Sequence, residues 1–251
     1  MKVLAILQAR MTSSRLPGKV MLGINGYPMI YWQILRILKC SEIDKLVVAT
    51  SIDSSDDVLV DFLNKKNIPV HRGSLTDVHS RFLEVVQNHE DYETVVRLTA
   101  DCPLVMPRLL TEMIHEFSLG QFDYYTNCIT PTYPDGLDIE IFSREMFLRM
   151  SHAELSEFER EHVTFKFRSP TDEIRIGHKI QFQDLSALRW TVDYAEDFDF
   201  VKRIFEHFKG SEAKFSAKDV LDALLDHPEL NTQLPGTLRN IALQGRELET
   251  E

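Results

Sequence analysis

The spacing of apolar residues in the first half of the chain predicts strands that alternate with helices. Residues 3–7 form an apolar run of strand length, as expected for a buried strand. Over residues 28–39, Ile30, Ile34 and Leu38 recur at helical spacing and define one apolar face. By the same criteria, further strands are expected over residues 45–49, 68–70 and 94–99, and further helices over residues 54–66, 76–88 and 108–119. This alternation predicts right-handed βαβ units on a parallel sheet.

The pattern changes beyond about residue 121, where short strands mix with helices. Strands are expected over residues 124–125, 139–142 and 174–180, and helices over residues 144–150, 156–167, 197–209 and 217–225. The sequence therefore predicts one α/β domain over residues 1–232. Its sheet is mainly parallel and twisted, is flanked by helices and includes a small mixed β subregion. Residues 233–251 are polar and predict a loose C-terminal tail.

Composition excludes several classes of protein. Apolar residues make up 43% of the 251 residues, enough to build a core, which argues against intrinsic disorder. The net charge of −11 disfavours binding to nucleic-acid backbones. The three cysteines do not suggest a disulfide framework. The first apolar run is too short for a signal peptide, and no window reaches the ~18 apolar residues of a membrane span. A soluble cytoplasmic protein without a nucleic-acid or membrane partner is expected.

The polar loop after the first strand concentrates positive charge among small residues. It contains Arg10, Arg15 and Lys19 together with Ser13, Ser14 and Gly18. Ligands of open parallel sheets bind beyond the carboxyl ends of strands, where small residues expose backbone N–H groups and cations neutralise phosphates. Neither GxxxxGK[ST] nor GxGxxG is present. The loop predicts phosphate binding of another type, and the alternative is a solvated surface loop.

Two aspartates stand at the ends of strand-like runs. Asp101 follows the strand over residues 94–99, and Asp193 follows residues 188–192. Mg²⁺ prefers such hard carboxylate oxygens and phosphate oxygens. If both runs join one sheet, the two carboxyl groups should lie within about 8 Å of each other. The alternative for each aspartate is an N-cap of the helix that follows it.

Weaker signals lie in the middle of the chain. Asp138 and Glu140 would share one strand face, where they would bind acceptor hydroxyls, a second metal or a nearby arginine. Arg72 and Ser74 precede the helix over residues 76–88, and the alternative there is a helix cap with a surface arginine. His162 lies on the helix expected over residues 156–167, whose alternative role is a solvated face.

Six segments together resemble a known family. They are ILQARMTSSRLPGKVM, HRGSLTDVHSRF, VRLTADCPLVMP, YPDGLDIEIFS, EREHVTFKF and RWTVDYAEDFDFV, spread over about residues 1–208. The chain resembles the cytidylyltransferases that activate acidic sugars, and more closely the SpsF-type spore-coat polysaccharide biosynthesis proteins. The resemblance implies a Rossmann-like nucleotidyltransferase fold, CTP as donor, Mg²⁺, and a homodimer. It leaves the acceptor open beyond a small acidic sugar or a sugar-like molecule.

The resemblance also implies site residues. Catalytic roles fall on Arg15, Lys19, Asp101 and Asp193, of which the two aspartates would bind the metal. Nucleotide contacts fall on Gln8, Ala9, Arg10, Ser14, Arg15, Lys19, Arg72, Ser74 and Asp101. From the residues themselves, the candidates for acceptor contacts are Asp138, Glu140, Arg160 and His162. The subregion over about residues 124–185 is expected to bind the acceptor and to provide the dimerisation surface.

There are two rival functions, a glycosyltransferase with the same sheet and a non-catalytic nucleotide-binding protein. A glycosyltransferase would need a DxD pair to hold its metal, but Asp101 is followed by Cys102 and Pro103, and Asp197-Phe198-Asp199 falls in an expected helix. A non-catalytic nucleotide-binding protein would have no need of the two aspartates. The sequence therefore favours a cytidylyltransferase that transfers CMP to its acceptor and releases pyrophosphate, in the biosynthesis of a surface polysaccharide.

Overall fold

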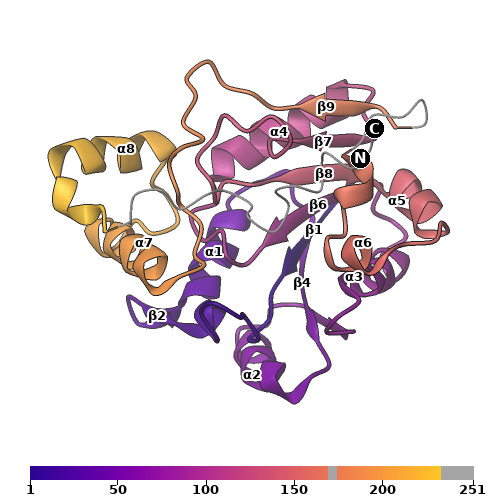
Figure 1. Ribbon diagram of the computed structural model, residues 1–251, viewed down its shortest axis with the longest axis horizontal. Helices are drawn as coiled ribbons and strands as arrows, with labels where there is room; N and C mark the ends of the chain where they lie inside the picture. The colour runs from indigo at the N-terminus through magenta and orange to yellow at the C-terminus, as the bar shows by residue number, and fades with distance from the viewer. Residues whose placement is uncertain (169–173, 233–251) are drawn as a thin grey trace.

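Seven strands form one sheet at the centre of the molecule, in the order β5-β4-β1-β6-β8-β7-β9. The computed structural model describes residues 1–168 and 174–232. Figure 1 shows the sheet running through the middle of the fold with helices on both sides.

One half of the sheet is parallel, as predicted. It consists of β5 (Val70–Gly73), β4 (Lys45–Ser51), β1 (Val3–Gln8) and β6 (Thr94–Thr99). Successive side chains of a strand point to opposite faces. In β1, Val3, Ala5 and Leu7 therefore enter one hydrophobic core, while Leu4 and Ile6 enter the other.

The other half is the mixed subregion. β8 (Glu140–Ser143) runs antiparallel to both β6 and β7 (Tyr124–Thr126), and β9 (Ile176–His178) pairs in parallel with β7 at the edge. The sequence-based expectation of a mainly parallel sheet with a small mixed subregion is confirmed.

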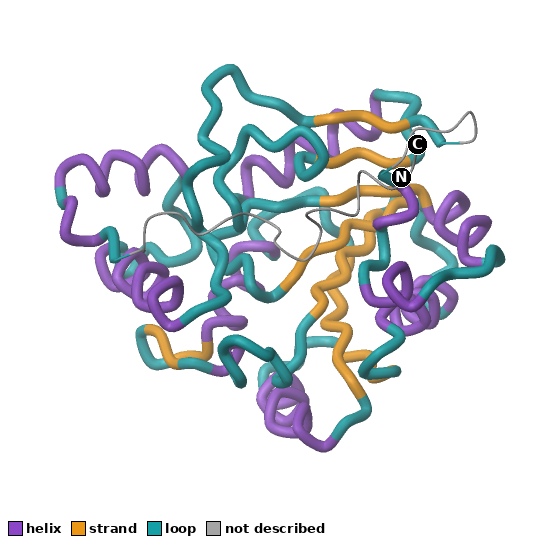
Figure 2. The backbone as a smooth tube through the Cα atoms, viewed as in Figure 1, coloured by secondary structure: helices purple, strands orange, loops and turns teal. Residues whose placement is uncertain are grey.

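Helices cover both faces of the sheet (Figures 1 and 2). The larger core takes residues from α1 (Met29–Ile37), α2 (Asp57–Lys65), α4 (Pro107–Leu119), α7 (Ala195–His207) and α8 (Ala217–Asp226). The smaller core takes residues from α3 (Val78–Gln87) and α5 (Arg144–Ser151). The short helix α6 (Glu157–Glu161) packs against α3.

Several element boundaries differ from the predictions. The loop expected over residues 8–26 contains a 3-10 turn at Lys19–Met21 and a small hairpin of β2 (Gly23–Ile24) and β3 (Tyr27–Pro28). The helix expected over residues 156–167 ends at Glu161, because the chain then turns inward to bury Val163, Thr164 and Phe167. The tail expected over residues 233–251 lies outside the described residues.

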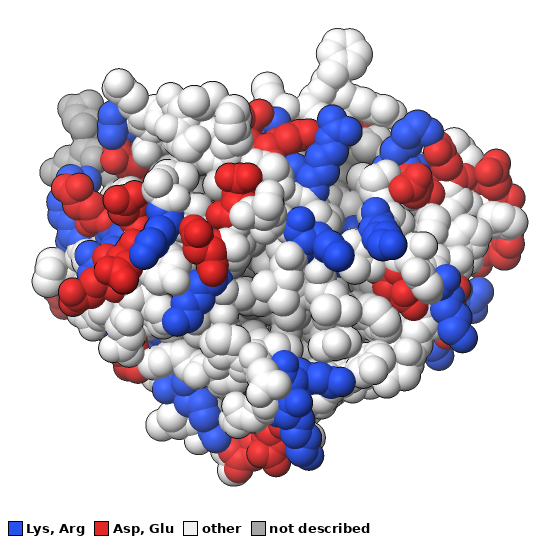
Figure 3. All heavy atoms as spheres, turned by 180° about the vertical axis from the view of Figure 1, so that it is seen from behind, with Lys and Arg blue, Asp and Glu red and all other residues white. Residues whose placement is uncertain are grey.

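Among the described residues, no helix is long and apolar enough to cross a bilayer. On the face seen in Figure 3, blue and red side chains are interspersed rather than gathered into one basic band.

Candidate active site

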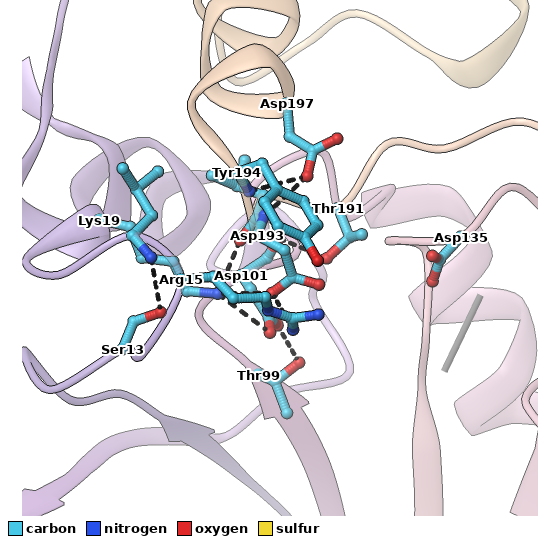
Figure 4. Close-up of polar contacts among 12 residues, drawn as sticks. Ser13, Arg15, Lys19, Thr99, Asp101, Asp135, Thr191, Asp193, Tyr194 and Asp197 are labelled. Atoms are coloured by element: carbon cyan, nitrogen blue, oxygen red, sulfur yellow. Dashed lines mark hydrogen bonds and ion pairs between the residues drawn. The ribbon is translucent and has the colours of Figure 1, made fainter. Parts of the chain in front are cut away.

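A cavity of about 550 Å³ opens beside the carboxyl ends of β1 and β6. Residues from the loop after β1 line it, among them Arg10, Ser14 and Arg15, and Asp101 and Asp193 line it from the other segments. Figure 4 shows the side chains of Arg15, Asp101 and Asp193 converging from the loop, the end of β6 and the run before α7. The position agrees with the rule that open α/β sheets bind ligands beyond the carboxyl ends of their strands.

Lys19 joins the three segments. Its side chain is nearly buried, and Nζ donates to the Val192 carbonyl oxygen at 2.6 Å and to Asp193 Oδ1 at 3.0 Å. The same Nζ lies 3.5 Å from Asp101 Oδ2. Two carboxylates that contact one ammonium group meet the separation of about 8 Å expected from the sequence, so that prediction is confirmed. Burial lowers the pKa of Lys19, but Asp101 and Asp193 together raise it by more, so the net pKa lies above its ordinary value.

Asp193 accepts contacts from three cations. Arg15 Nη2 lies 2.8 Å and Lys19 Nζ 3.0 Å from Oδ1, and Arg189 Nη2 lies 3.0 Å from Oδ2. The interpretation of Asp193 as the cap of the next helix is wrong, because α7 begins at Ala195 after Tyr194, and it is Asp197 that accepts the backbone N–H groups of both Asp193 and Tyr194.

Asp101 is held at the end of β6 by its neighbours. Thr99 Oγ1 donates to Asp101 Oδ1 at 2.6 Å, and the Asp101 carbonyl accepts the backbone N–H of Val192 at 2.7 Å. Burial alone would raise the pKa of the Asp101 carboxyl, but Lys19, Thr99 and Cys102 lower it below its ordinary range. Asp101 is not a helix cap either, since Met106 occupies that position for α4.

Arg189 positions the Asp193 segment, and the sequence interpretation missed it. It is almost fully buried, and its guanidinium contacts Asp135 at 3.0 Å and Asp197 at 3.0 Å as well as Asp193. The backbones of Asp135 and Arg189 also form a parallel β-bridge. A signal was present in the sequence, because an arginine in a run destined for burial requires acidic partners.

Gly136 allows this bridge to form. Its φ is +104°, and a Cβ at this position would lie 2.4 Å from the backbone nitrogen of Thr191 and 2.4 Å from the carbonyl carbon of Trp190. A side chain there would push away the segment that carries Asp193.

The other residues expected to bind the nucleotide in and before the loop have different surroundings. Arg10 lines the cavity and lies 3.7 Å from Glu161, and Gln8 accepts from Arg97 Nη2 at 3.2 Å. Ser14 also lines the cavity, whereas Ala9 is buried and its N–H donates to the Ala49 carbonyl at 3.1 Å.

Arg72 and Ser74 do not line this cavity. Arg72 donates to the Ser51 carbonyl at 2.8 Å and pairs with Asp57 at 2.8 Å. Ser74 Oγ accepts the N–H of Asp77, which caps α3. These contacts match the alternative of a helix cap with a surface arginine. A nucleotide contact by Arg72 or Ser74 stays a prediction.

The expected acceptor residues divide into two groups. Asp138, Glu140 and His162 line the cavity, but Arg160 does not, and it pairs with Asp77 at 2.7 Å.

Glu140 has arginines as partners. For Asp138 and Glu140, the sequence left three kinds of partner open, namely acceptor hydroxyls, a second metal or a nearby arginine, and at Glu140 the structure shows the arginine. This buried carboxylate contacts Arg97, Arg168 at 3.4 Å, Thr164 at 2.6 Å and the Tyr124 hydroxyl. Burial alone would raise the pKa of Glu140, but Arg97 and Arg168 outweigh it and lower the pKa to about 2.

Buried guanidinium nitrogens near the cavity lack partners in the part of the chain that the structure describes. Nε of Arg97 and Nε of Arg168 make no hydrogen bond, and both residues line the cavity. Arg81, fully buried in the first turn of α3, has no partner for any of its three nitrogens. Such donors are costly to leave unpaired and mark places where a ligand or water would supply acceptors.

The donor set at the two aspartates suits Mg²⁺ only together with a ligand. Among the described residues, no group of three or more His, Cys, Asp or Glu side chains is arranged to hold a metal ion. Asp101 and Asp193 offer two hard carboxylates on one side of the cavity, and Mg²⁺ is commonly bound by one or two carboxylates plus substrate phosphates and water. The residues therefore fit a magnesium ion that arrives with a phosphorylated substrate.

Comparison with known proteins agrees with the fold and identifies the family. The cytidylyltransferase family model matches residues 4–218, so the chain belongs to the cytidylyltransferase family. This membership defines a CTP-dependent nucleotidyltransferase.

Individual relatives extend the agreement over nearly the whole chain. The spore coat polysaccharide biosynthesis protein SpsF of Bacillus subtilis is 30% identical over 240 residues, covering 92% of this chain and 97% of the relative. A cytidylyltransferase from Leptospira borgpetersenii superposes with a TM-score of 0.87 at 29% identity, covering 95% of this chain and 99% of that one. CMP:2-keto-3-deoxy-manno-octonic acid synthetase, solved with CTP, has the same fold, with a TM-score of 0.64 at 18% identity over 83% of this chain and 100% of that one.

Proposed function

We propose that this enzyme transfers CMP from CTP to a small acidic sugar or sugar-like acceptor. The observation that carries the proposal is the meeting of Lys19 with Asp101 and Asp193 beside Arg15, at the open edge of the sheet. The names of two relatives give the direction, since one belongs to spore-coat polysaccharide biosynthesis and the other makes a CMP-linked sugar acid. A role in building a surface polysaccharide, acting as a homodimer, completes the proposal.

In this reaction an acceptor oxygen attacks the α-phosphorus of CTP. A new P–O bond forms as the bond to the β-phosphate oxygen breaks, the pyrophosphate leaves in line, and the acceptor loses its proton to solvent. Arg10, Arg15 and Lys19 hold the triphosphate, with Ser14 beside them, and Asp101 and Asp193 hold Mg²⁺. When bound, Mg²⁺ neutralises charge that develops on the phosphate oxygens. The protein contributes mainly by positioning and by charge stabilisation.

The rival glycosyltransferase function finds no support at its DxD triplet. Asp197 is buried against Arg189 and accepts two backbone N–H groups, and Asp199 pairs with Arg203 at 2.9 Å on α7. Neither carboxylate belongs to the lining of the cavity.

The decisive experiment measures pyrophosphate release with each of the four NTPs and Mg²⁺, across a panel of acidic sugars and sugar phosphates. We expect turnover with CTP and at least one carboxylate-bearing acceptor. UTP should be rejected by about a hundredfold or more, because its base exchanges a donor for an acceptor and leaves buried polar groups unpaired. Equal turnover with UTP or GTP would overturn the assignment of CTP, and light scattering would decide the dimer separately.

A further inference from the structure

Asp56 is a fully buried carboxylate that the proposed reaction does not use. It ends the 3-10 turn Ser54–Asp56 that leads into α2. Its Oδ2 accepts from Thr50 Oγ1 at 2.8 Å, from the Ser51 N–H at 2.9 Å and from the Ser51 hydroxyl. Its Oδ1 accepts the backbone N–H of Met11 at 2.6 Å, across 45 residues of sequence.

Met11 is the residue on which the cationic loop closes. Its carbonyl accepts the N–H of Ser13 at 3.0 Å and the N–H of Gly18 at 2.8 Å. Gly18 has a left-handed backbone with φ +72°, and Lys19 follows it directly. The backbone of Met11 thus binds both ends of the segment that presents Ser14 and Arg15, and its own N–H is fixed by Asp56.

A charged acceptor suits this task. A hydrogen bond from an N–H to a carboxylate is shorter and about twice as strong as one to a neutral acceptor. Asp56 is also close enough to the buried Arg81 to interact with it electrostatically. One oxygen of the carboxylate is therefore held by β4, and the other accepts the N–H of the loop.

We propose that Asp56 is a positioning residue for the nucleotide: it fixes Met11, and through Met11 the arrangement of Arg15 and Lys19 around the triphosphate. The ligand in this inference rests on the proposed function, but the anchoring of the loop does not. Asp56 itself does not line the cavity, so it acts through the loop.

The main test compares Asp56→Ala with Ser51→Ala. Both disturb the same buried site, but only Asp56→Ala frees the Met11 N–H, because the Ser51 hydroxyl binds the other oxygen. We expect Asp56→Ala to weaken CTP binding about tenfold, the cost of one hydrogen bond to a charged group. Ser51→Ala should leave the Kd within about twofold, while both variants melt earlier. A folded Asp56→Ala protein with wild-type affinity, or equal losses in the two variants, overturns the proposal.

A second variant covers the case in which Asp56→Ala does not fold. Asp56→Asn keeps the volume, but its single carbonyl oxygen can serve only one of the two backbone N–H groups, that of Met11 or that of Ser51. Hydrogen exchange of these amides shows which one is lost. CTP affinity should fall only if the Met11 amide exchanges faster. The proposal is overturned if the affinity falls while the Met11 amide stays protected. It is also overturned if the affinity is unchanged while the Met11 amide exchanges faster. If the wild-type protein bound no CTP, the proposed function would fail, but hydrogen exchange would still test the anchoring. Met11 and Gly18 should then exchange faster in Asp56→Ala than in Ser51→Ala, and equal rates would overturn the anchoring.

Discussion

Two parts of the site handle charge in opposite ways. At the nucleotide end, formed by Arg15, Lys19, Asp101 and Asp193, the side chains of Arg15 and Asp101 are 40% and 32% exposed. Those of Lys19 and Asp193 are only 11% and 13% exposed, and Lys19 does not line the cavity. In the part of the lining around Glu140, the Glu140 cluster of Glu140, Arg97 and Arg168 is nearly closed to solvent, and the Glu140 side chain is only 4% exposed.

This difference separates groups available to a ligand from groups already committed to the fold. The ion pairs at the nucleotide end join three segments that are distant in the sequence, and the exposure of Arg15 and Asp101 lets phosphate and metal reach these two side chains. Glu140 is surrounded by four side-chain donors, so exchanging any of them for a substrate hydroxyl would leave a buried cation or hydroxyl unpaired. The nucleotide end should therefore respond to substitution in activity, and the Glu140 cluster in stability.

The largest effect is expected at the two aspartates. Asp101→Asn and Asp193→Asn should each lower kcat by roughly a thousandfold, because each removes a metal-binding charge with almost no change in volume. The far-UV circular dichroism spectrum should be unchanged. Asp199→Asn, on the exposed side of α7, is the matched control and should turn over at the wild-type rate. Wild-type activity in Asp193→Asn would leave Asp101 as the only candidate ligand of the pair.

Glu140→Gln should act mainly on stability. It removes the counter-charge of two buried arginines, which should cost about 3 kcal/mol or more in the free energy of unfolding measured with urea. The matched control Glu206→Gln breaks the half-exposed pair with Lys202 and should cost far less. A stable Glu140→Gln protein with a raised KM for the acceptor would instead make Glu140 a binding residue.

The same substitution should alter the acid limb of the stability profile. The folded-state pKa of Glu140, about 2, lies below the ordinary value of 4.5, so its ionised form stabilises the fold above pH 4.5. That contribution is lost as the pH falls from 4.5 toward 2. Glu140→Gln should flatten this part of the curve, and a curve of unchanged steepness would contradict the assignment.

The smallest effect should come from Arg15. Arg15→Ala removes one charge-assisted contact to the triphosphate and should weaken CTP binding about tenfold, as measured by calorimetry with Mg²⁺ present. Its melting temperature should stay close to that of the wild-type protein, since the side chain is partly exposed. Arg108→Ala breaks an exposed pair with Glu112 of the same 2.8 Å length and controls for lost positive charge. Equal affinities in the two variants would remove Arg15 from the phosphate site.

The parallel half of the sheet and the nucleotide end could be predicted from the sequence because each has a local sequence pattern. Apolar runs predict β1 and β6, and cations among small residues predict the loop between β1 and α1. The meeting of Asp101 with Asp193 was expected if both preceding runs joined one sheet. The run before Asp193 is not a strand of the sheet, however, and forms only an isolated bridge between Arg189 and Asp135. It is the Val192 N–H, which donates to the Asp101 carbonyl oxygen, that brings the two aspartates together.

The other features of the site depend on contacts between residues far apart in the sequence, and no local pattern predicts such contacts. Asp56 looked like an ordinary acid in the first turn of a helix, yet its partner Met11 lies 45 residues earlier. Arg97 and Arg168 meet Glu140 across 43 and 28 residues, which turned an expected acceptor contact into an internal ion pair. The inward turn of the chain after Glu161 likewise depends on the distant Glu140, which accepts from Thr164.

Lys19 has a consequence for how this protein reaches its native state. Where carboxylates are gathered to hold a divalent ion and nothing else balances them, the apoprotein must fold against their repulsion. Here each of the two aspartates has the Lys19 ammonium within 3.5 Å. The chain thus brings its own counter-ion to the place where the two acids lie close together, so a side chain of the protein already offsets their repulsion in the apoprotein.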